Sequence, residues 1–225
     1  QGLDLAIRLL ADRGDPVWVE NPGYPGTRAV LQANGANLQY IPVDDAGMQV
    51  ERGIEQALSP RVICVTPMRQ FPTGAVLSED RKQQLLNFGN NVGAWIIEDD
   101  FDAEAHYVAQ SPRSLLAFKN STRVVLLGTF STTLVPPLRL GYLVVPPDLI
   151  PAFANARSIA QGHGSLVEQM VLSEMMNRGL YAAHLRKMRK LYLGRQKTLV
   201  SAMEDAFNFT VPDLQKGSGM HITLK

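Results

Sequence analysis

Cysteine is almost absent from this sequence: Cys64 is the single one among 225 residues. A lone cysteine cannot form a disulfide within the chain, which favours a reducing compartment. Because Cys64 lies inside the apolar run Val62–Val65, we expect it to be a buried small hydrophobic residue. The sequence also lacks a signal peptide and any apolar stretch near the roughly 20 residues that cross a membrane. These absences predict a cytoplasmic protein with no membrane partner.

An excess of charge of one sign is missing as well. Lysine and arginine number 22 against 21 aspartate and glutamate residues, which gives a net charge of +1. A nucleic-acid-binding domain usually carries a clear basic excess, so nothing in the composition indicates a DNA-binding surface in this chain. The histidines show no spacing typical of a metal site, and we predict no bound metal: His106, His163, His184 and His221.

What the sequence does contain is the balance of an ordinary globular protein, with 45% hydrophobic and 19% charged residues. Short apolar segments alternate with helical patterns as far as residue 147. The strands expected from these segments are Val17–Val19, Leu38–Val43, Val62–Val65, Ala94–Ile97, Val124–Leu127 and Leu138–Val145. Several are apolar on both faces, which predicts a three-layer α/β/α fold with a mostly parallel sheet. Ligands of such folds bind at the carboxyl ends of the strands.

Local signals set the ends of several expected helices. The first helical pattern is expected to end at Arg13–Gly14, a basic residue followed by a glycine cap. Ser78 is expected to cap a helix with Glu79 and Asp80 in its first turn, ending near Gly89.

The character of the chain changes after Pro147. Three helices are expected, and the basic run 184–190 in the last of them is expected to face solvent: Leu149–Ala160, Leu166–Met176 and Leu180–Phe207. Met220–Leu224 then has the pattern of a strand. We predict a large domain over residues 1–147 and the helical start of an α+β small domain over residues 148–225. The chain begins within a helical pattern and stops within this strand, so we expect both domains to be incomplete.

The hydroxyl-rich turn between the last two expected strands is the first candidate binding site. Thr129, Ser131, Thr132 and Thr133 offer hydroxyl groups. Arg139 offers a planar guanidinium that can grip a dianion at two points, so the layout is suited to holding a phosphate. Alternatively, the hydroxyls satisfy the turn and Arg139 forms a surface ion pair.

A second candidate follows the strand Ala94–Ile97. Asp99 at that strand end could keep a pyridinium nitrogen protonated, or could cap the segment that follows. Glu98 and Asp100 compete for either role.

The segment GTFSTTLVPPLRLGYLVVP resembles the cofactor-lysine segment of fold-type I aminotransferases, in the version carried by MocR-type regulators of the GntR family. The family pattern is G-T-F-S-K-T-L-x-P-x-L-R-L-G-Y, and its lysine forms the Schiff base with pyridoxal phosphate. Thr132 stands at the lysine position and has no amine with which to do so. We do not expect Lys119 or Lys187 to replace it, because they belong to the far end of a strand and to the helical unit.

Three further segments carry the same resemblance. ENPGYPG resembles E-D-P-G-Y-P-G, whose tyrosine, here Tyr24, stacks on the cofactor ring. TPMRQFPTG resembles the pocket loop T-P-S-H-Q-F-P-T-G, with Arg69 in place of histidine. IIEDDFDAE resembles I-I-E-D-D-Y-D-S-E, which implies that Asp99 contacts the pyridine nitrogen and that Phe101 replaces a hydrogen-bonding tyrosine. The phosphate contacts carry over to Thr129, Ser131 and Arg139.

The resemblance runs over almost the whole chain, and its departures concentrate at the cofactor. It implies an effector-sensing and dimerising domain of a MocR-type transcriptional regulator, without transaminase activity and with pyridoxal phosphate bound non-covalently or lost. It further implies a homodimer, a small amine or amino-acid effector, and DNA contacts only through a domain outside this chain. One alternative is a fragment of an active aminotransferase whose catalytic lysine has been mutated to Thr132. Another is a vestigial scaffold that only dimerises.

Overall fold

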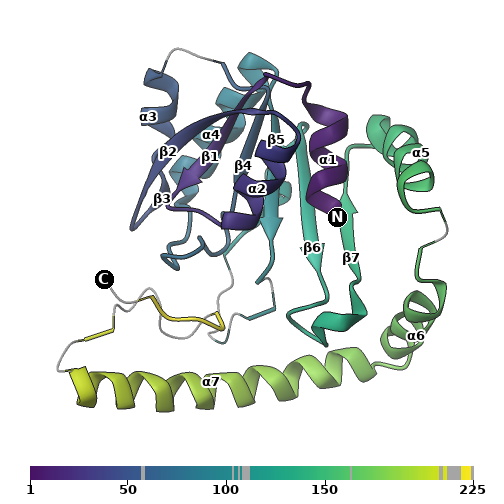
Figure 1. Cartoon of the computed structure of the whole chain (residues 1–225). Helices are drawn as coiled ribbons and strands as arrows, with labels where there is room; N and C mark the ends of the chain where they lie inside the picture. The colour runs from purple at the N-terminus through teal and green to yellow at the C-terminus, as the bar shows by residue number, and fades with distance from the viewer. Residues whose placement is uncertain are drawn as a thin grey trace.

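The computed structural model of the chain describes residues 1–56, 59–102, 104–105, 107, 112–162, 164–207, 210–211 and 219–223. Its centre is a seven-stranded sheet in the order β3-β2-β1-β4-β5-β6-β7 (Figure 1). The central pairings are parallel, and the edge strands β3 and β7 run antiparallel to their neighbours. The prediction of a mostly parallel sheet is confirmed. The strands are β1 (Pro16–Asn21), β2 (Asn37–Asp44), β3 (Gly47–Met48), β4 (Val62–Val65), β5 (Trp95–Asp100), β6 (Val124–Thr129) and β7 (Gly141–Val144).

Helices cover both faces of the sheet, as the three-layer prediction requires. One apolar core includes Ile7, Leu31 and Phe153 from α1, α2 and α5, and the other includes Val50 and Leu85 from α3 and α4. In Figure 1, α1 and α2 lie in front of the strands. The helices are α1 (Gly2–Leu10), α2 (Pro25–Ala33), α3 (Val50–Glu55), α4 (Glu79–Val92), α5 (Ile150–Gln161), α6 (Leu166–Asn177) and α7 (Leu180–Phe207).

Two helix ends differ from the prediction. The Ser78 side chain accepts a hydrogen bond from the Arg81 backbone N–H, as expected of a cap, but α4 continues to Val92. It ends there because Gly93 adopts the left-handed conformation with φ 73°. Helix α1 ends at Leu10, where Ala11 is extended, so the predicted cap at Gly14 is wrong.

The second strand of the hydroxyl-rich segment is shorter than predicted. Pro136–Leu138 form a 3-10 turn, Arg139 has a left-handed φ of 51°, and β7 begins at Gly141. Proline has no N–H to give to a sheet ladder, so the consecutive prolines delay the strand. Residues 220–223 form no strand, and Leu224 lies outside the described residues. Instead, the backbone carbonyl of His221 accepts a hydrogen bond from Arg69 at 2.9 Å.

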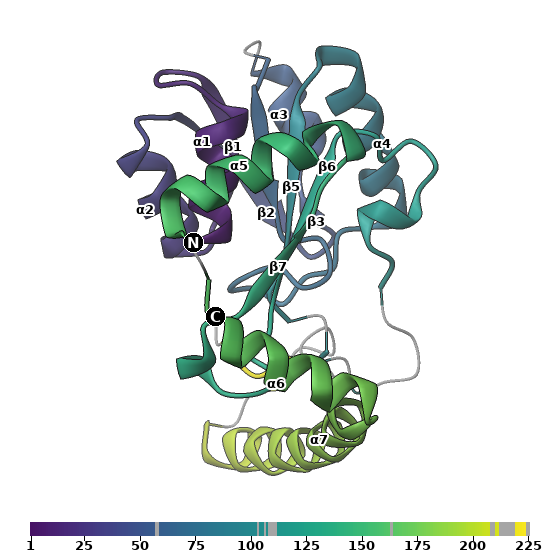
Figure 2. The same ribbon diagram turned by 90° about the vertical axis from the view of Figure 1, so that its right-hand side faces the viewer.

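The last three helices occupy different positions relative to the sheet. Helix α5 packs on α1, and Phe153 enters the core beneath it. Helices α6 and α7 lie beyond the carboxyl ends of the strands, as Figure 2 shows from the side. In α7, Arg186, Lys187 and Lys190 are exposed as predicted. His184 and Arg189 are half-buried, because they bond to Thr133 and Glu104 on the sheet side. Among the described helices, none is both long and apolar enough to span a bilayer.

Candidate functional site

The three consecutive carboxylates at the end of β5 have separate surroundings. Strand alternation turns Asp99 to the same face as Trp95 and Ile97, towards α1 and α2. Glu98 faces the other way and accepts hydrogen bonds from the Ser114 hydroxyl at 2.9 Å and the Leu115 N–H at 3.1 Å. Glu98 thus binds the start of the 3-10 turn Leu115–Ala117 and not the segment directly after β5, and Asp99 is left available to a ligand.

Asp99 lines a small cavity of about 20 Å³ at the carboxyl ends of β1, β4 and β5. Its other lining residues include Leu3 on α1, Glu20, Tyr24 and Thr66. The structure thus brings together Asp99 and Tyr24, two of the residues predicted from separate segments. Burial raises the pKa of Asp99 to about 6, because the carboxylate loses hydration.

Glu20 is a site residue that sequence reasoning missed. It accepts hydrogen bonds from Thr66 Oγ1 at 2.5 Å and from Gln70 Nε2 at 3.4 Å. Burial raises its pKa to about 7, and the charge of Asp99 adds to that rise. The available signal was its place at a strand end, directly before the turn that leads to Tyr24.

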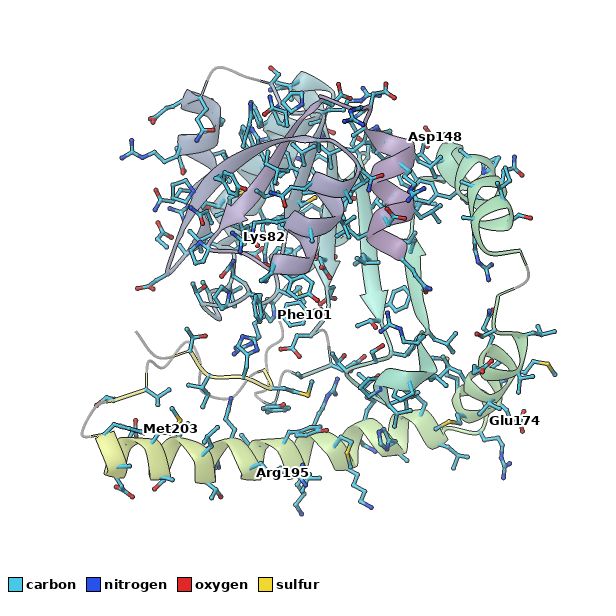
Figure 3. All side chains as sticks on the ribbon, in the orientation of Figure 1. Lys82, Phe101, Asp148, Glu174, Arg195 and Met203 are labelled. Carbon is cyan, nitrogen blue, oxygen red and sulfur yellow. The ribbon has the colours of Figure 1, made fainter. Side chains whose placement is uncertain are left out.

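Tyr24 stands at the open side of this cavity, with 49% of its surface exposed. Its ring meets the edge of Phe71 at a centroid distance of 5.5 Å. Phe71 in turn contacts Phe101 at 6.3 Å and His221 at 5.2 Å. Phe101 lies below the sheet, in the space above α7 (Figure 3). These rings form a row that leads from the small cavity towards the C-terminal segment 219–223.

The hydroxyl-rich turn satisfies much of its own hydrogen bonding. Thr129 Oγ1 accepts from the Ser131 N–H at 3.1 Å, and Thr132 Oγ1 donates to the Phe101 carbonyl at 3.0 Å. The pairing of Thr129 with Gly141, followed by a hydrogen bond from Phe130 to Leu140, sets Arg139 beside Ser131 at the end of the hairpin. Thr129, Ser131 and Arg139 therefore meet at one end of the sheet, and Arg139 is exposed.

The start of α1 reaches the same end of the sheet. A Cβ on Gly2 would lie 2.6 Å from Leu127 Cδ1 and 3.7 Å from a Leu143 methyl carbon, so the start of α1 packs closely on β6 and β7. The first backbone N–H groups of a helix lack intrahelical partners and favour an anion. The start of α1, the hydroxyl-rich turn and Arg139 thus lie at the same end of the sheet.

A larger cavity of about 270 Å³ lies between this turn and the last two helices. The described residues that line it are Asp100, Glu104, Thr129, Phe130, Thr132, Thr133, Tyr142, Met176 and Tyr181. Asp100 is 8% exposed, and its Oδ1 has no hydrogen-bond partner. Burial raises the pKa of Asp100 to about 7, with further contributions from Glu98, Asp99, Asp102 and Glu104.

Arg69 does not line either cavity. Its Nε lies 3.4 Å from Asp102 Oδ2, and both side chains are almost fully buried. Its Nη2 donates to the carbonyl of His221, so the guanidinium joins the pocket loop to the segment 219–223. No lysine is among the described residues that line the two cavities. Nor does any cluster of three metal-binding side chains occur in the part of the chain that the structure describes.

A family profile described as "Aminotransferase class I and II" matches residues 1–221 of this chain. The chain belongs to the class I and II aminotransferase family. The kynurenine aminotransferase of Pyrococcus horikoshii, solved in complex with PMP, has the same fold as this chain. The TM-score is 0.88 and the sequence identity is 29%. The match covers 97% of this chain and 56% of that enzyme.

Curated relatives include transcriptional regulators. The probable rhizopine catabolism regulatory protein MocR of Rhizobium meliloti is 40% identical over 199 residues, which are 88% of this chain and 40% of that protein. The HTH-type transcriptional regulator TauR of Rhodobacter capsulatus is 35% identical over 207 residues, 91% of this chain and 42% of that protein. The chain therefore spans less than half the length of either regulator.

Proposed function

We propose that this chain is the aminotransferase-like sensing and dimerisation part of a MocR-type transcriptional regulator, which holds pyridoxal phosphate without a covalent bond and does not transaminate. One observation carries the proposal: the hydroxyl of Thr132, at the lysine position of the resemblance, bonds to the backbone of Phe101, while the cavity around Asp99 and Tyr24 is kept. The similarity to MocR and TauR supports a regulatory role. DNA contacts would come from a part of the protein outside this chain.

The chemical groups present fit the cofactor's ring and phosphate. Asp99 would hold the pyridine nitrogen, and a protonated pyridinium there would offset the cost of burying the carboxylate. Thr129, Ser131, Arg139 and the start of α1 would hold the phosphate. When bound, pyridoxal phosphate supplies an electron sink for reactions at the carbon next to an amine. Phe101 has no hydroxyl with which to tune the ring.

The cavity around Asp99 is too small for the cofactor ring unless a side chain moves. A cavity of about 20 Å³ holds one water-sized molecule, not a pyridine ring. Tyr24 is half exposed and belongs to no apolar core cluster among the described residues, so it can swing outwards. We infer that the cofactor ring, when it binds, moves the Tyr24 side chain outwards from the mouth of the cavity. In the new position the Tyr24 ring covers the cofactor ring.

Homodimer formation is supported by an apolar face on α6. Leu166, Val167, Met170 and Val171 are spaced along one side of the helix and are all more than half exposed. Exposed apolar patches of this kind mark protein–protein contacts. Val167→Lys is expected to shift the chain from dimer to monomer in analytical ultracentrifugation, whereas Ser158→Lys on α5 should leave the mass unchanged.

The decisive experiment asks whether the cofactor is bound and whether it is attached. Wild-type protein mixed with pyridoxal phosphate should show a visible absorbance band, and borohydride treatment followed by mass measurement should add no cofactor mass. Thr132→Lys should gain that mass at residue 132, and Asp99→Asn should weaken the absorbance change.

Two outcomes would favour the other functions. Reduction that fixes cofactor mass on a lysine of the wild-type protein, or conversion of an amino acid to its keto acid, would support an active aminotransferase. Absence of any binding by both wild type and Thr132→Lys would support a scaffold that only dimerises.

A further inference from the structure

The cavity of about 270 Å³ is separate from the Asp99 pocket, although both begin at the end of β5. It opens on the Asp100 side of that strand. Its walls come from the hydroxyl-rich turn, from Tyr142 on β7, from Met176 at the end of α6 and from Tyr181 at the start of α7. A ligand here would therefore touch both the sheet and the last two helices.

Asp100 gives this cavity a buried carboxyl group with one oxygen that has no partner. The side chain is more than nine-tenths buried, lines the cavity, and has an Oδ1 with no hydrogen-bond donor within reach. The second carboxylate, on Glu104, is paired with the guanidinium of Arg189. No lysine or arginine is among the described lining residues, so Asp100 has no opposing cation there. A buried carboxylate in this position favours a cationic ligand.

Three aromatic side chains also line the cavity. The ring of Phe130 lies 5.5 Å from that of Tyr142 and 5.9 Å from that of Tyr181. Aromatic faces attract cations and also cover the hydrocarbon part of a ligand. Thr133 and Tyr181, whose hydroxyl groups are 3.1 Å apart, add further hydrogen-bonding capacity at the rim.

We propose that this cavity binds a small organic primary ammonium ion, with the ammonium on the Asp100 carboxylate and the hydrocarbon body against the cavity-facing sides of Phe130 and Tyr142. A free amino acid is a poorer ligand, because its carboxylate would lie in the same cavity as the unpaired carboxylate of Asp100. The volume is ample, since an apolar cavity of roughly 150 Å³ already accepts benzene. The role of this amine as the effector rests on the proposed sensing function. The binding site itself does not depend on it.

The test is calorimetric titration of the whole chain with 2-phenylethylammonium chloride. We expect binding at least about tenfold tighter than that of 2-phenylethanol, which has a similar shape and no charge. Asp100→Asn should lose at least about tenfold in affinity for the ammonium ion. Asp148→Asn, at an exposed carboxylate that lines neither cavity, should bind it like the wild type.

Pyridoxal phosphate titrated in parallel separates this inference from the proposed function. Cofactor binding that depends on Asp99, together with amine binding that depends on Asp100, supports both. Equal affinities for the ammonium ion and the alcohol overturn the amine site, whether or not the cofactor binds. So does an Asp100→Asn protein that retains wild-type affinity for the ammonium ion. If Asp100→Asn fails to fold by circular dichroism, the comparison of ammonium ion and alcohol on the wild type decides.

Discussion

The ion pair between Arg69 and Asp102 makes a sharp prediction about stability. The two side chains are 1% and 3% exposed, and Nε lies 3.4 Å from Oδ2. Burial lowers the pKa of Arg69 and raises the pKa of Asp102, and in each case it outweighs the opposite effect of the partner's charge. Each charge thus depends on the other, because neither is hydrated.

Arg69→Met removes the cation and leaves the Asp102 carboxylate buried without its partner. Breaking a buried pair in this way lowers the free energy of unfolding by about 3–5 kcal/mol. Asp102→Asn should cost less, because the guanidinium keeps its hydrogen bond to His221. The double variant Arg69→Met/Asp102→Asn removes both charges, so its loss should fall short of the sum of the single losses by about 1–3 kcal/mol.

Urea unfolding at pH 7.5 would measure these losses. The unfolding is monitored by far-ultraviolet circular dichroism and by the fluorescence of Trp18 and Trp95. The matched control is Arg52→Met. Arg52 pairs with Glu55 at 3.3 Å, but both side chains are 65% exposed, so this variant should change stability by less than about 1 kcal/mol. Additive losses in the double variant would refute the coupling, as would an Arg69→Met loss no larger than that of the control.

Two further predictions concern Glu20 and Gly219. Burial raises the pKa of Glu20 from 4.5 to about 7, so the folded chain keeps a proton that the unfolded chain releases in this range; stability therefore falls as the pH rises between these values. Glu20→Gln should remove up to about 3 kcal/mol of that fall. The assignment is contradicted if the urea midpoint changes between pH 4.5 and pH 7.5 by the same amount in the variant and in the wild type. Gly219 has φ 75°, and a Cβ there would lie 2.0 Å from Arg69 Nε. Gly219→Ala should therefore speed amide exchange in residues 219–223, whereas Gly93→Ala, at φ 73° with open space around it, should leave that segment unchanged.

Local patterns predicted much of the fold. Helix α7 has the predicted bounds, Ser78 caps α4, and Cys64 is buried inside β4. The second strand begins at Gly141 and not at the predicted Leu138, because Pro136–Leu138 form a 3-10 turn and Arg139 is left-handed, which the apolar pattern does not record. Asp99 and Tyr24 meet at one cavity, because β1 and β5 lie on either side of β4 and their carboxyl ends share one edge of the sheet.

By itself, the sequence determined the helical or strand period of most segments, the Ser78 cap that begins α4 and the family to which the chain belongs. These depend on neighbours within a few residues, or on short sequence motifs that can be recognised without the structure. Only the tertiary structure decided how the three carboxylates of β5 divide among a cap, a small pocket and a larger cavity, because alternate residues of a strand face different layers. It also brought Arg69 to Asp102 and to His221, 152 residues away in the chain. Such contacts follow from the packing of whole layers, which no local pattern records.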